Sequence, residues 1–309
     1  MQLIKPKFWD KKIGFISIIL LPFTLIYLAI IYFKKKFLQI KSFKIPIICV
    51  GNIYLGGTGK TPTSILLANE LQSLGKNPAI LRKFYKNHND EHDLIKNSFK
   101  NLILDKDRIA GIIKAEKLGF DTIILDDGLQ DYKIHKTLSI VCFNQSQLIG
   151  NGLAIPSGPL RESLNALSNA HIVIINGERN ISFEDKILRI NKKLKIFYSF
   201  YKPINLENFK NKKLLALAGI GNPENFFQLL EKNNLKIKKK IVIPDHYVFS
   251  KKEFLNIIND ANINNYHIVM TEKDYFKVKS YTTNKIDFLK VDLIIKNREK
   301  LLSVIKERM

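Results

Sequence analysis

The sequence contains little cysteine, no internal repeat and no low-complexity linker. Its two cysteines, Cys49 and Cys142, lie far apart in apolar runs, without a CxxC pair or a Cys/His cluster. We therefore expect neither a disulfide framework nor a zinc module. The chain has 309 residues, 46% of them hydrophobic and 25% charged. This is the composition of a globular protein of about two domains, which excludes the disordered and fibrous classes.

Acidic residues are scarce relative to basic ones. The chain carries 50 Lys and Arg against 28 Asp and Glu, so its formal net charge is +22. Such an excess suits an anionic partner: nucleic acid, an acidic membrane surface or a phosphorylated substrate. A general bias of the sequence toward Lys, Asn and Ile explains the charge equally well. Nucleic acid is not expected, because the lysines are dispersed and no stacking-aromatic motif is present.

Charged residues are absent from Ile13 to Phe33. As one helix this run would be about 31 Å long, close to the hydrocarbon thickness of a bilayer. A cleaved signal peptide fits poorly, because the run is long and no small-residue cleavage site follows it. A buried helix is seldom apolar on all sides. We therefore expect a membrane-anchoring helix, with a weak charge bias toward a cytoplasmic body, and Pro22 also permits a kinked segment lying partly in one leaflet.

Short apolar strands alternate with helical segments beyond Lys44. The pattern predicts an α/β fold of the P-loop NTPase type, with a doubly wound, mainly parallel sheet and a second, smaller α/β lobe. A composition shift around residues 180–212 suggests a seam, so the expected divisions are an anchor at 1–43, a P-loop domain at 44–200 and a C-terminal lobe at 201–309. The expected strands are Ile45–Val50, Pro78–Leu81, Thr122–Leu125, Ser139–Phe143, His171–Ile175, Leu214–Ala218, Lys240–Ile243 and His267–Met270.

The segment GGTGKT follows the first of these strands and opens a helix, as a phosphate-binding loop must. Glycines let backbone N–H groups converge on phosphate oxygens, Lys60 would neutralise the β- and γ-phosphates, and the Thr61 hydroxyl would hold Mg²⁺. The strict pattern has a glycine where Tyr54 stands. The predicted nucleotide-binding residues are Tyr54, Leu55, Gly56, Gly57, Thr58, Gly59, Lys60 and Thr61, and the expected cofactors are ATP and Mg²⁺.

A second signal is the apolar strand that ends in Asp126 and Asp127. In a P-loop protein, an Asp at this sheet edge supports Mg²⁺, although a strand ending in Asp-Asp-Gly is often only a turn. A partitioning-type switch ATPase is less favoured, because Leu55 stands where that class has a lysine. A membrane-tethered P-loop ATPase that controls a partner protein remains the alternative to a kinase.

The ordered motifs VGNIYLGGTGKTP, DDGLQ, GNGLAIPSGPLRESL, AGIGNPENFF, IPDHY and MTEKD, preceded by a membrane segment, resemble the tetraacyldisaccharide 4′-kinase family. The resemblance covers about residues 8–280. It implies transfer of the ATP γ-phosphoryl group to the 4′-hydroxyl of a tetraacylated glucosamine disaccharide 1-phosphate, giving lipid IVA. It also implies an enzyme anchored at the cytoplasmic face of the bacterial inner membrane, with the lipid substrate in the bilayer and no obligate protein partner.

The resemblance also implies roles for residues outside the phosphate loop. Asp90 would be the catalytic base, paired with His246, and Glu91 would lie beside metal or substrate. Arg161 would contact phosphate, Glu162 would contribute a further Mg²⁺ interaction, and Arg108 would bind substrate phosphate. From the residues alone, Asp90 reads as a loop acid, His246 as part of a helix cap, Arg161 and Glu162 as a turn with an ion pair, and Arg108 as a helix-surface residue.

The chain departs from the family where the latter has Ser-Arg-Gly-Tyr-Gly and a longer basic stretch. Here residues 81–86 read LRKFYK, without glycine, and the loop to Asp90 is short. This departure bears on the alignment of Asp90 and on acceptor preference, but not on the phosphate loop or Asp126. The segment Thr271–Asp274 (TEKD) receives no chemical role from the sequence.

Overall fold

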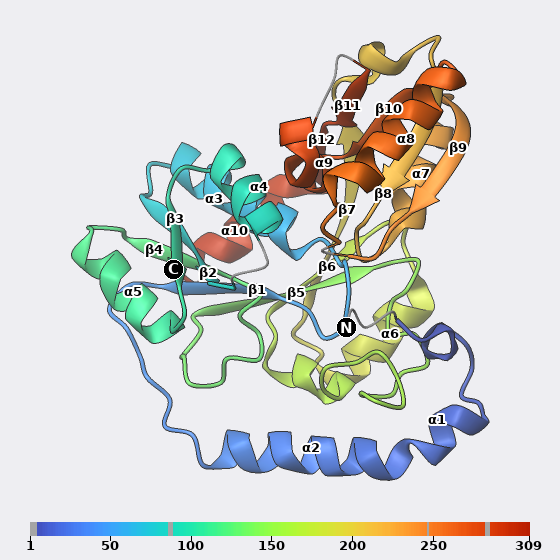
Figure 1. Cartoon of the computed structure of the whole chain (residues 1–309). Helices are drawn as coiled ribbons and strands as arrows, with labels where there is room; N and C mark the ends of the chain where they lie inside the picture. The colour runs from blue at the N-terminus through green and yellow to red at the C-terminus, as the bar shows by residue number, and fades with distance from the viewer. Residues whose placement is uncertain (1–4, 86–88, 246, 282–284) are drawn as a thin grey trace. The chain divides into compact units, whose positions relative to one another are not determined.

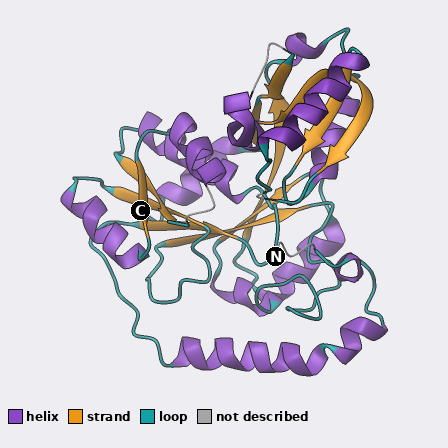
Figure 2. Cartoon of the chain, viewed as in Figure 1, coloured by secondary structure: helices purple, strands orange, loops and turns teal. Residues whose placement is uncertain are grey.

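The structure is a computed structural model that describes residues 5–85, 89–245, 247–281 and 285–309. The chain forms two compact units (Figures 1 and 2). The larger unit comprises Leu3–Phe84, Phe99–Phe200 and Leu293–Met309, and the smaller contains Tyr85–Ser98 and Tyr201–Asp292. Both units are thus built from separate stretches of chain rather than from the continuous ranges that the sequence suggests.

An eight-stranded sheet forms the centre of the larger unit. Its first strands are almost wholly apolar and buried, as expected where helices cover both faces. The strands paired along β6-β5-β1-β4-β2-β3 run parallel, which confirms the predicted α/β class with a mainly parallel sheet. In spatial order the strands are β12 (Val291–Ile295), β7 (Lys195–Pro203), β6 (Ile172–Asn176), β5 (Leu138–Asn144), β1 (Ile47–Gly51), β4 (Thr122–Asp126), β2 (Pro78–Lys83) and β3 (Leu102–Asp105).

Helices pack on both faces of this sheet. On one face, Ile47 and Cys49 of β1 share a core cluster with Ile112 and Ile187. Arg298, the first residue of the last helix, forms an ion pair with Glu70 of the helix Lys60–Ser73. This contact attaches the C-terminal segment to the larger unit. The helices are α3 (Lys60–Ser73), α5 (Arg108–Lys117), α6 (Ile181–Ile190) and α10 (Arg298–Lys306), with short 3₁₀ turns η1 (Lys7–Asp10) and η2 (Leu164–Asn169).

The smaller unit has its own four-stranded parallel sheet. Its central strands are apolar and buried, and a capping box between Ser250 and Glu253 fixes the start of one covering helix. The strand order is β11 (Ile286–Leu289), β10 (His267–Thr271), β8 (Lys213–Ala218) and β9 (Lys236–Val242). The helices are α4 (Asn89–Ser98), α7 (Pro223–Lys232), α8 (Lys251–Ile263) and α9 (Glu272–Val278), with 3₁₀ turns η3 (Leu206–Phe209) and η4 (Lys279–Tyr281).

The N-terminal apolar run does not form the single helix that the sequence predicts. It is divided into α1 (Phe15–Ile19) and α2 (Leu21–Lys36), drawn in blue in Figure 1. The break falls beside Pro22, which has no N–H to donate and is tolerated only in the first turn of a helix. In the part of the chain that the structure describes, no helix combines the length and the apolar character needed to cross a membrane.

Helices α1 and α2 have an unusual distribution of side chains. Two polar residues, Ser17 and Thr24, are buried against the body of the larger unit. Thr24 Oγ1 lies 2.8 Å from Ser157 Oγ, and Asn151 Nδ2 donates to Ser17 Oγ at 3.2 Å. The exposed face is instead apolar, with the large side chains Phe15, Ile16, Ile18, Ile19, Phe23, Leu25, Ile26, Ile30, Tyr32, Phe33 and Phe37 all open to the surroundings.

Candidate active site

The phosphate loop connects the end of β1 to the start of α3 within the larger unit. Gly59 immediately precedes α3 with φ 86°, a left-handed conformation that favours glycine. Asn52 braces the loop, because its Nδ2 donates to the Gly56 carbonyl at 3.1 Å and to Thr58 Oγ1 at 3.0 Å. The loop therefore presents the N-terminus of α3, with Lys60 and Thr61 as its first residues, in the arrangement that binds phosphate.

Tyr54 and Leu55 contribute to this loop in a different way. The Tyr54 ring is fully buried, and its hydroxyl accepts from Lys5 Nζ at 2.8 Å and donates to Asp10 Oδ1 at 2.6 Å. Burial, aided by Asp10, raises the pKa of Tyr54. The Leu55 side chain is exposed, while its N–H donates to the Pro159 carbonyl at 2.8 Å. Both residues thus fix the path of the loop.

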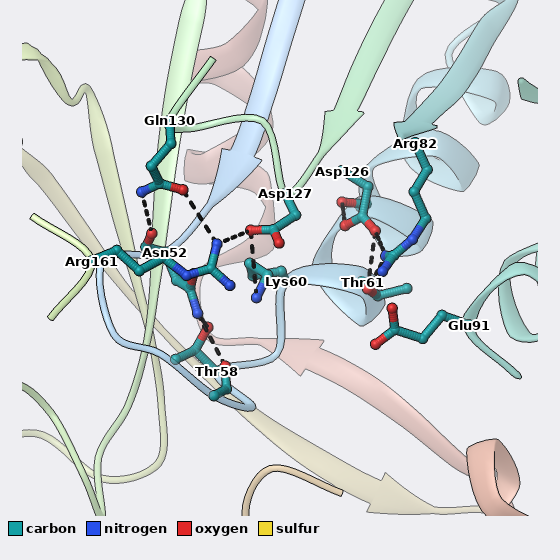
Figure 3. A network of polar contacts seen from close by, with 12 residues as sticks. Asn52, Thr58, Lys60, Thr61, Arg82, Glu91, Asp126, Asp127, Gln130 and Arg161 are labelled. Atoms are coloured by element: carbon teal, nitrogen blue, oxygen red, sulfur yellow. Dashed lines mark hydrogen bonds and ion pairs between the residues drawn. The ribbon is translucent and has the colours of Figure 1, made fainter. Parts of the chain in front are cut away.

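Lys60 and Asp127 form the charged centre of the site (Figure 3). Lys60 Nζ lies 3.6 Å from Asp127 Oδ1, and Arg161 Nη1 donates to the same oxygen at 2.8 Å. Burial lowers the pKa of Lys60, and Asp127 partly opposes this. Burial alone would raise the pKa of Asp127, but Lys60 and Arg161 outweigh it and hold that pKa well below its usual range.

Asp126 lies beside Asp127 at the end of β4 and is fully buried. Its Oδ2 accepts from Thr61 Oγ1 at 3.1 Å, and its Oδ1 accepts from Ser64 Oγ at 2.9 Å. Arg82 of β2 forms an ion pair with the same carboxylate. The Thr61 hydroxyl and the Asp126 carboxylate are hard oxygen donors placed together at the phosphate loop, so this pair fits the ligand chemistry of Mg²⁺.

Glu162 occupies a different position from the other predicted metal residues. It is buried, and its two oxygens accept from Lys35, Gln130 and Tyr132 at 2.7, 2.9 and 3.0 Å. Among the described residues, no cluster of three or more His, Cys, Asp and Glu side chains is arranged to hold a metal ion. The metal roles of Asp127 and Glu162 therefore stay predictions.

Arg108, at the start of α5, contacts the backbone at the end of β4. Its Nη2 donates to the Asp127 carbonyl at 2.7 Å and to the Asp126 carbonyl at 3.3 Å, and its Nη1 lies 3.6 Å from Asp131 Oδ2. Arg108 is nearly buried, so it is not the exposed residue on a helix surface that its local sequence alone suggests. These contacts hold the backbone of the two site aspartates in place. Binding of substrate phosphate by Arg108 stays a prediction.

The smaller unit carries a second group of charged residues. Asp90 and Glu91 lie in the first turn of α4, where Asp90 is buried. Lys273 of α9 lies 3.0 Å from Glu91 Oε1, 2.9 Å from Asp245 Oδ1 and 3.7 Å from Asp90 Oδ2. Lys277 Nζ lies 3.6 Å from Asp90 Oδ2 and 2.8 Å from Asp274 Oδ1. His246, the predicted partner of Asp90, lies outside the described residues.

Comparison with known proteins gives one consistent result. A family model described as tetraacyldisaccharide-1-P 4′-kinase matches residues 16–309. The chain is 42% identical over 308 residues to a tetraacyldisaccharide 4′-kinase of Pelagibacter ubique (strain HTCC1062), covering 97% of this chain and 96% of that protein. It is 33% identical to the corresponding protein of Francisella tularensis subsp. novicida (strain U112), covering 94% and 98%.

The chain belongs to the tetraacyldisaccharide-1-P 4′-kinase family. The fold agrees, because the structure is similar to a crystal structure of LpxK from Aquifex aeolicus in complex with ATP. That similarity has a TM-score of 0.70 at 25% identity and covers 94% of this chain and 99% of the other. The resemblance inferred from the motifs is confirmed, and the chain is an ATP-dependent kinase of the lipid A disaccharide.

Several residues with notable polar contacts, in one unit or the other, were not recognised from the sequence. Arg82 ends a predicted strand, but its pairing with Asp126 depends on β2 lying next to β4. Gln130 belongs to the DDGLQ motif that carried the family resemblance, yet only the structure shows it between Arg161 and Glu162. Lys273 lies in the family motif MTEKD, and its place in that motif was the one sign in the sequence that it has a role.

Proposed function

We propose that the chain transfers the γ-phosphoryl group of ATP to the 4′-hydroxyl of a tetraacylated glucosamine disaccharide 1-phosphate. The observation that carries this proposal is the phosphate loop, in which Lys60 and Thr61 open α3 directly beside Asp126 and Asp127. Lys60 would bind the β- and γ-phosphates, and Arg161 would add a second cation. Transfer of a phosphoryl group spreads negative charge over its oxygens, so preorganised cations at this point favour the transition state.

Mg²⁺ fits the same site. The Thr61 hydroxyl and the Asp126 carboxylate would hold it, and when bound it would polarise phosphate oxygens and neutralise their charge. Arg82 forms an ion pair with Asp126 in the structure, so this arginine would share the carboxylate or turn toward phosphate when nucleotide is present.

Asp90 is our candidate for the group that accepts the proton of the attacking sugar hydroxyl. It is buried in the first turn of α4, and two lysines, Lys273 and Lys277, approach its carboxylate at 3.7 and 3.6 Å. A carboxylate at this position can accept a proton, which is the task of a general base. Pairing of Asp90 with His246 remains part of the proposal and draws its support from the family motif alone.

We further propose that α1 and α2 attach the enzyme to the cytoplasmic face of the bacterial inner membrane. Their outward face carries a continuous set of large apolar side chains, and Lys34, Lys35 and Lys36 end α2. Apolar side chains that enter the headgroup region and lysines that face anionic lipids both favour binding to a membrane surface. A lipid substrate that stays in the bilayer would then meet the enzyme on that surface.

The direct test is phosphate transfer from γ-labelled ATP with Mg²⁺ and detergent-solubilised protein. The acceptor is the tetraacyl disaccharide 1-phosphate, and a reaction without lipid is run alongside. We expect label in the lipid with the wild-type protein and none with Lys60→Ala. Lys76→Ala, the same replacement at an exposed position beyond the far end of α3, should retain activity. Equal release of free phosphate with and without lipid would instead indicate the membrane-tethered ATPase.

A further inference from the structure

Helix α2 contacts the phosphate site through its inward face. Thr24, Tyr27 and Lys35 are spaced by three and eight residues, which places them on one side of a helix with 3.6 residues per turn. All three contact the segment 154–162, which carries Arg161. Thr24 Oγ1 donates to the Ala154 carbonyl at 3.2 Å, so the first turn of α2 lies against the start of this segment.

The two remaining contacts are made to Arg161 and Glu162, at the end of this segment. The Tyr27 hydroxyl donates to the Arg161 carbonyl at 2.6 Å, and Lys35 Nζ donates to Glu162 Oε2 at 2.7 Å. The Lys35 ammonium also lies 4.2 Å from the centre of the Tyr132 ring, which donates its own hydroxyl to Glu162. The consecutive residues Arg161 and Glu162 are thus held by side chains about two turns apart along α2.

From Glu162 a chain of polar contacts leads inward to Lys60. Glu162 Oε1 accepts from Gln130 Nε2 at 2.9 Å, and Gln130 Oε1 accepts from Arg161 Nη1 at 3.3 Å. The same Arg161 nitrogen donates to Asp127 at 2.8 Å, and Asp127 lies 3.6 Å from Lys60 (Figure 3). Every residue in this chain belongs to the larger unit.

Glu162 makes this chain sensitive to α2. Its side chain is only 4% exposed, whereas that of Lys35 is 39% exposed. A buried carboxylate that loses its cation must move toward water or find another partner. Glu162 directly follows Arg161 and shares Gln130 with it, so such a movement would displace the guanidinium from Asp127.

We propose that Lys35 and Tyr27 are positioning residues of the kinase site, which act on Arg161 through Glu162 and through the Arg161 backbone. The inference rests on the proposed function for the role of Arg161. It makes the helix whose outer face is apolar a structural part of the phosphate site. Lipid contact on one side of α2 and phosphate binding on the far side of segment 154–162 are then properties of one assembly.

The test compares Lys35→Met with Lys36→Met in the full-length protein. Both changes remove one positive charge from the last turn of α2, so both should alter vesicle binding to the same extent. The two positions differ in their contacts, because the Lys36 side chain is exposed and makes no contact with Glu162 among the described interactions. We expect Lys35→Met to lower kcat at least about tenfold with a change in the KM for ATP below about threefold. Lys35→Arg should restore most of the rate, and Tyr27→Phe should lower kcat more mildly.

Hydrogen exchange supplies a readout that does not depend on the reaction. The N–H groups of Leu160 and Arg161 donate to the Leu153 and Ile53 carbonyls, so their exchange reports opening of the segment. We expect exchange at least about tenfold faster in Lys35→Met and unchanged in Lys36→Met. Equal kcat and equal exchange in the two variants, or a loss of kcat without faster exchange, would overturn the inference. If the wild-type protein labels no lipid, the proposed function fails, while the exchange comparison still decides whether α2 positions Arg161.

Discussion

Replacement of Lys273 by Met tests the charged cluster of the smaller unit. Lys273 lies within 3.0 Å of Glu91 and 2.9 Å of Asp245, and 3.7 Å from Asp90. Each of the two close pairs corresponds to about 5–6 kcal/mol of Coulomb attraction at an effective dielectric constant of about 20, before desolvation. Most of this attraction offsets the cost of removing the charges from water.

Removing one partner of a buried ion pair typically costs about 3–5 kcal/mol. We take the lower end of this range for Lys273→Met, because Asp245 is about one-third exposed and Lys277 remains beside Asp90. With a denaturant slope of about 2–3 kcal/mol/M, a loss of about 3 kcal/mol moves the urea midpoint down by about 1 M. Lys273→Arg should recover much of this loss, since it keeps the charge.

The assay is urea unfolding followed by circular dichroism, with Lys239→Met as the matched control. Lys239 belongs to the same unit and pairs with Asp260 at 2.8 Å, but both side chains are well exposed. Such a surface pair contributes about 0–1 kcal/mol, so the control should unfold close to the wild type. If Lys273→Met and Lys239→Met unfold at the same urea concentration, the cluster does not stabilise the unit in the way described.

Three further predictions concern catalysis, pH dependence and membrane binding. Asp90→Ala should lower kcat by about 10²–10⁴ while leaving the dissociation constant of ATP within about threefold, measured by single-turnover kinetics and nucleotide titration; a change in affinity alone would exclude the role of base. Asp127 has a depressed pKa in the folded state, so it stabilises the protein above its ordinary pKa of about 3.9 and loses this effect as the pH falls below it. Asp127→Asn should therefore be about 2 kcal/mol less stable than wild type at pH 7, with a gap that narrows in urea unfolding below about pH 4; a constant gap would contradict this. The double variant Phe23→Ser/Ile30→Ser should sediment with anionic vesicles at least tenfold less, because each lost side chain contributes about 1.5–3 kcal/mol, whereas Leu118→Ser should match wild type; equal sedimentation of all three would count against the membrane face.

The sheet of the larger unit could be predicted wherever burial on both faces produces a continuous apolar strand. The strands β1, β4 and β5 meet this condition and lie close to the predicted ranges. The short strands β3 and β11 could not be recognised, because four residues carry too little pattern. For β9, with the sequence KIKKKIV, only the apolar end was predicted, since its lysines are exposed.

The N-terminal helix shows a different limit of the sequence. Hydropathy treats Ser17, Thr24 and Pro22 as minor interruptions of an apolar run. In the folded chain Pro22 ends the continuity of the helix, and the two hydroxyls mark the buried side. The expected contrast of an apolar inside and a polar outside is reversed here, and only the contact with Ser157 and Asn151 reveals it.

Among the candidate functional residues of the two units, those in short local motifs could be predicted and distant pairings could not. The phosphate loop and the strand end at Asp126 follow from short stretches of sequence. The pairing of Arg82 with Asp126 depends on strand order, and that of Lys273 with Glu91 joins residues 182 positions apart. Neither can be derived from spacing along the chain, because it is the tertiary fold that brings the partners together.

The reversed polarity of α1 and α2 has a practical consequence for the preparation of this enzyme. A common way to improve solubility is to delete an apolar N-terminal segment. Here that deletion would remove the Lys35, Tyr27 and Thr24 contacts and uncover Ser157 and the buried Glu162. A truncated protein would lack the apolar surface, but its segment 154–162 would be exposed and no longer held by α2, next to the phosphate loop. Amphiphiles that cover the outer face of the intact helices are therefore the better choice for purification.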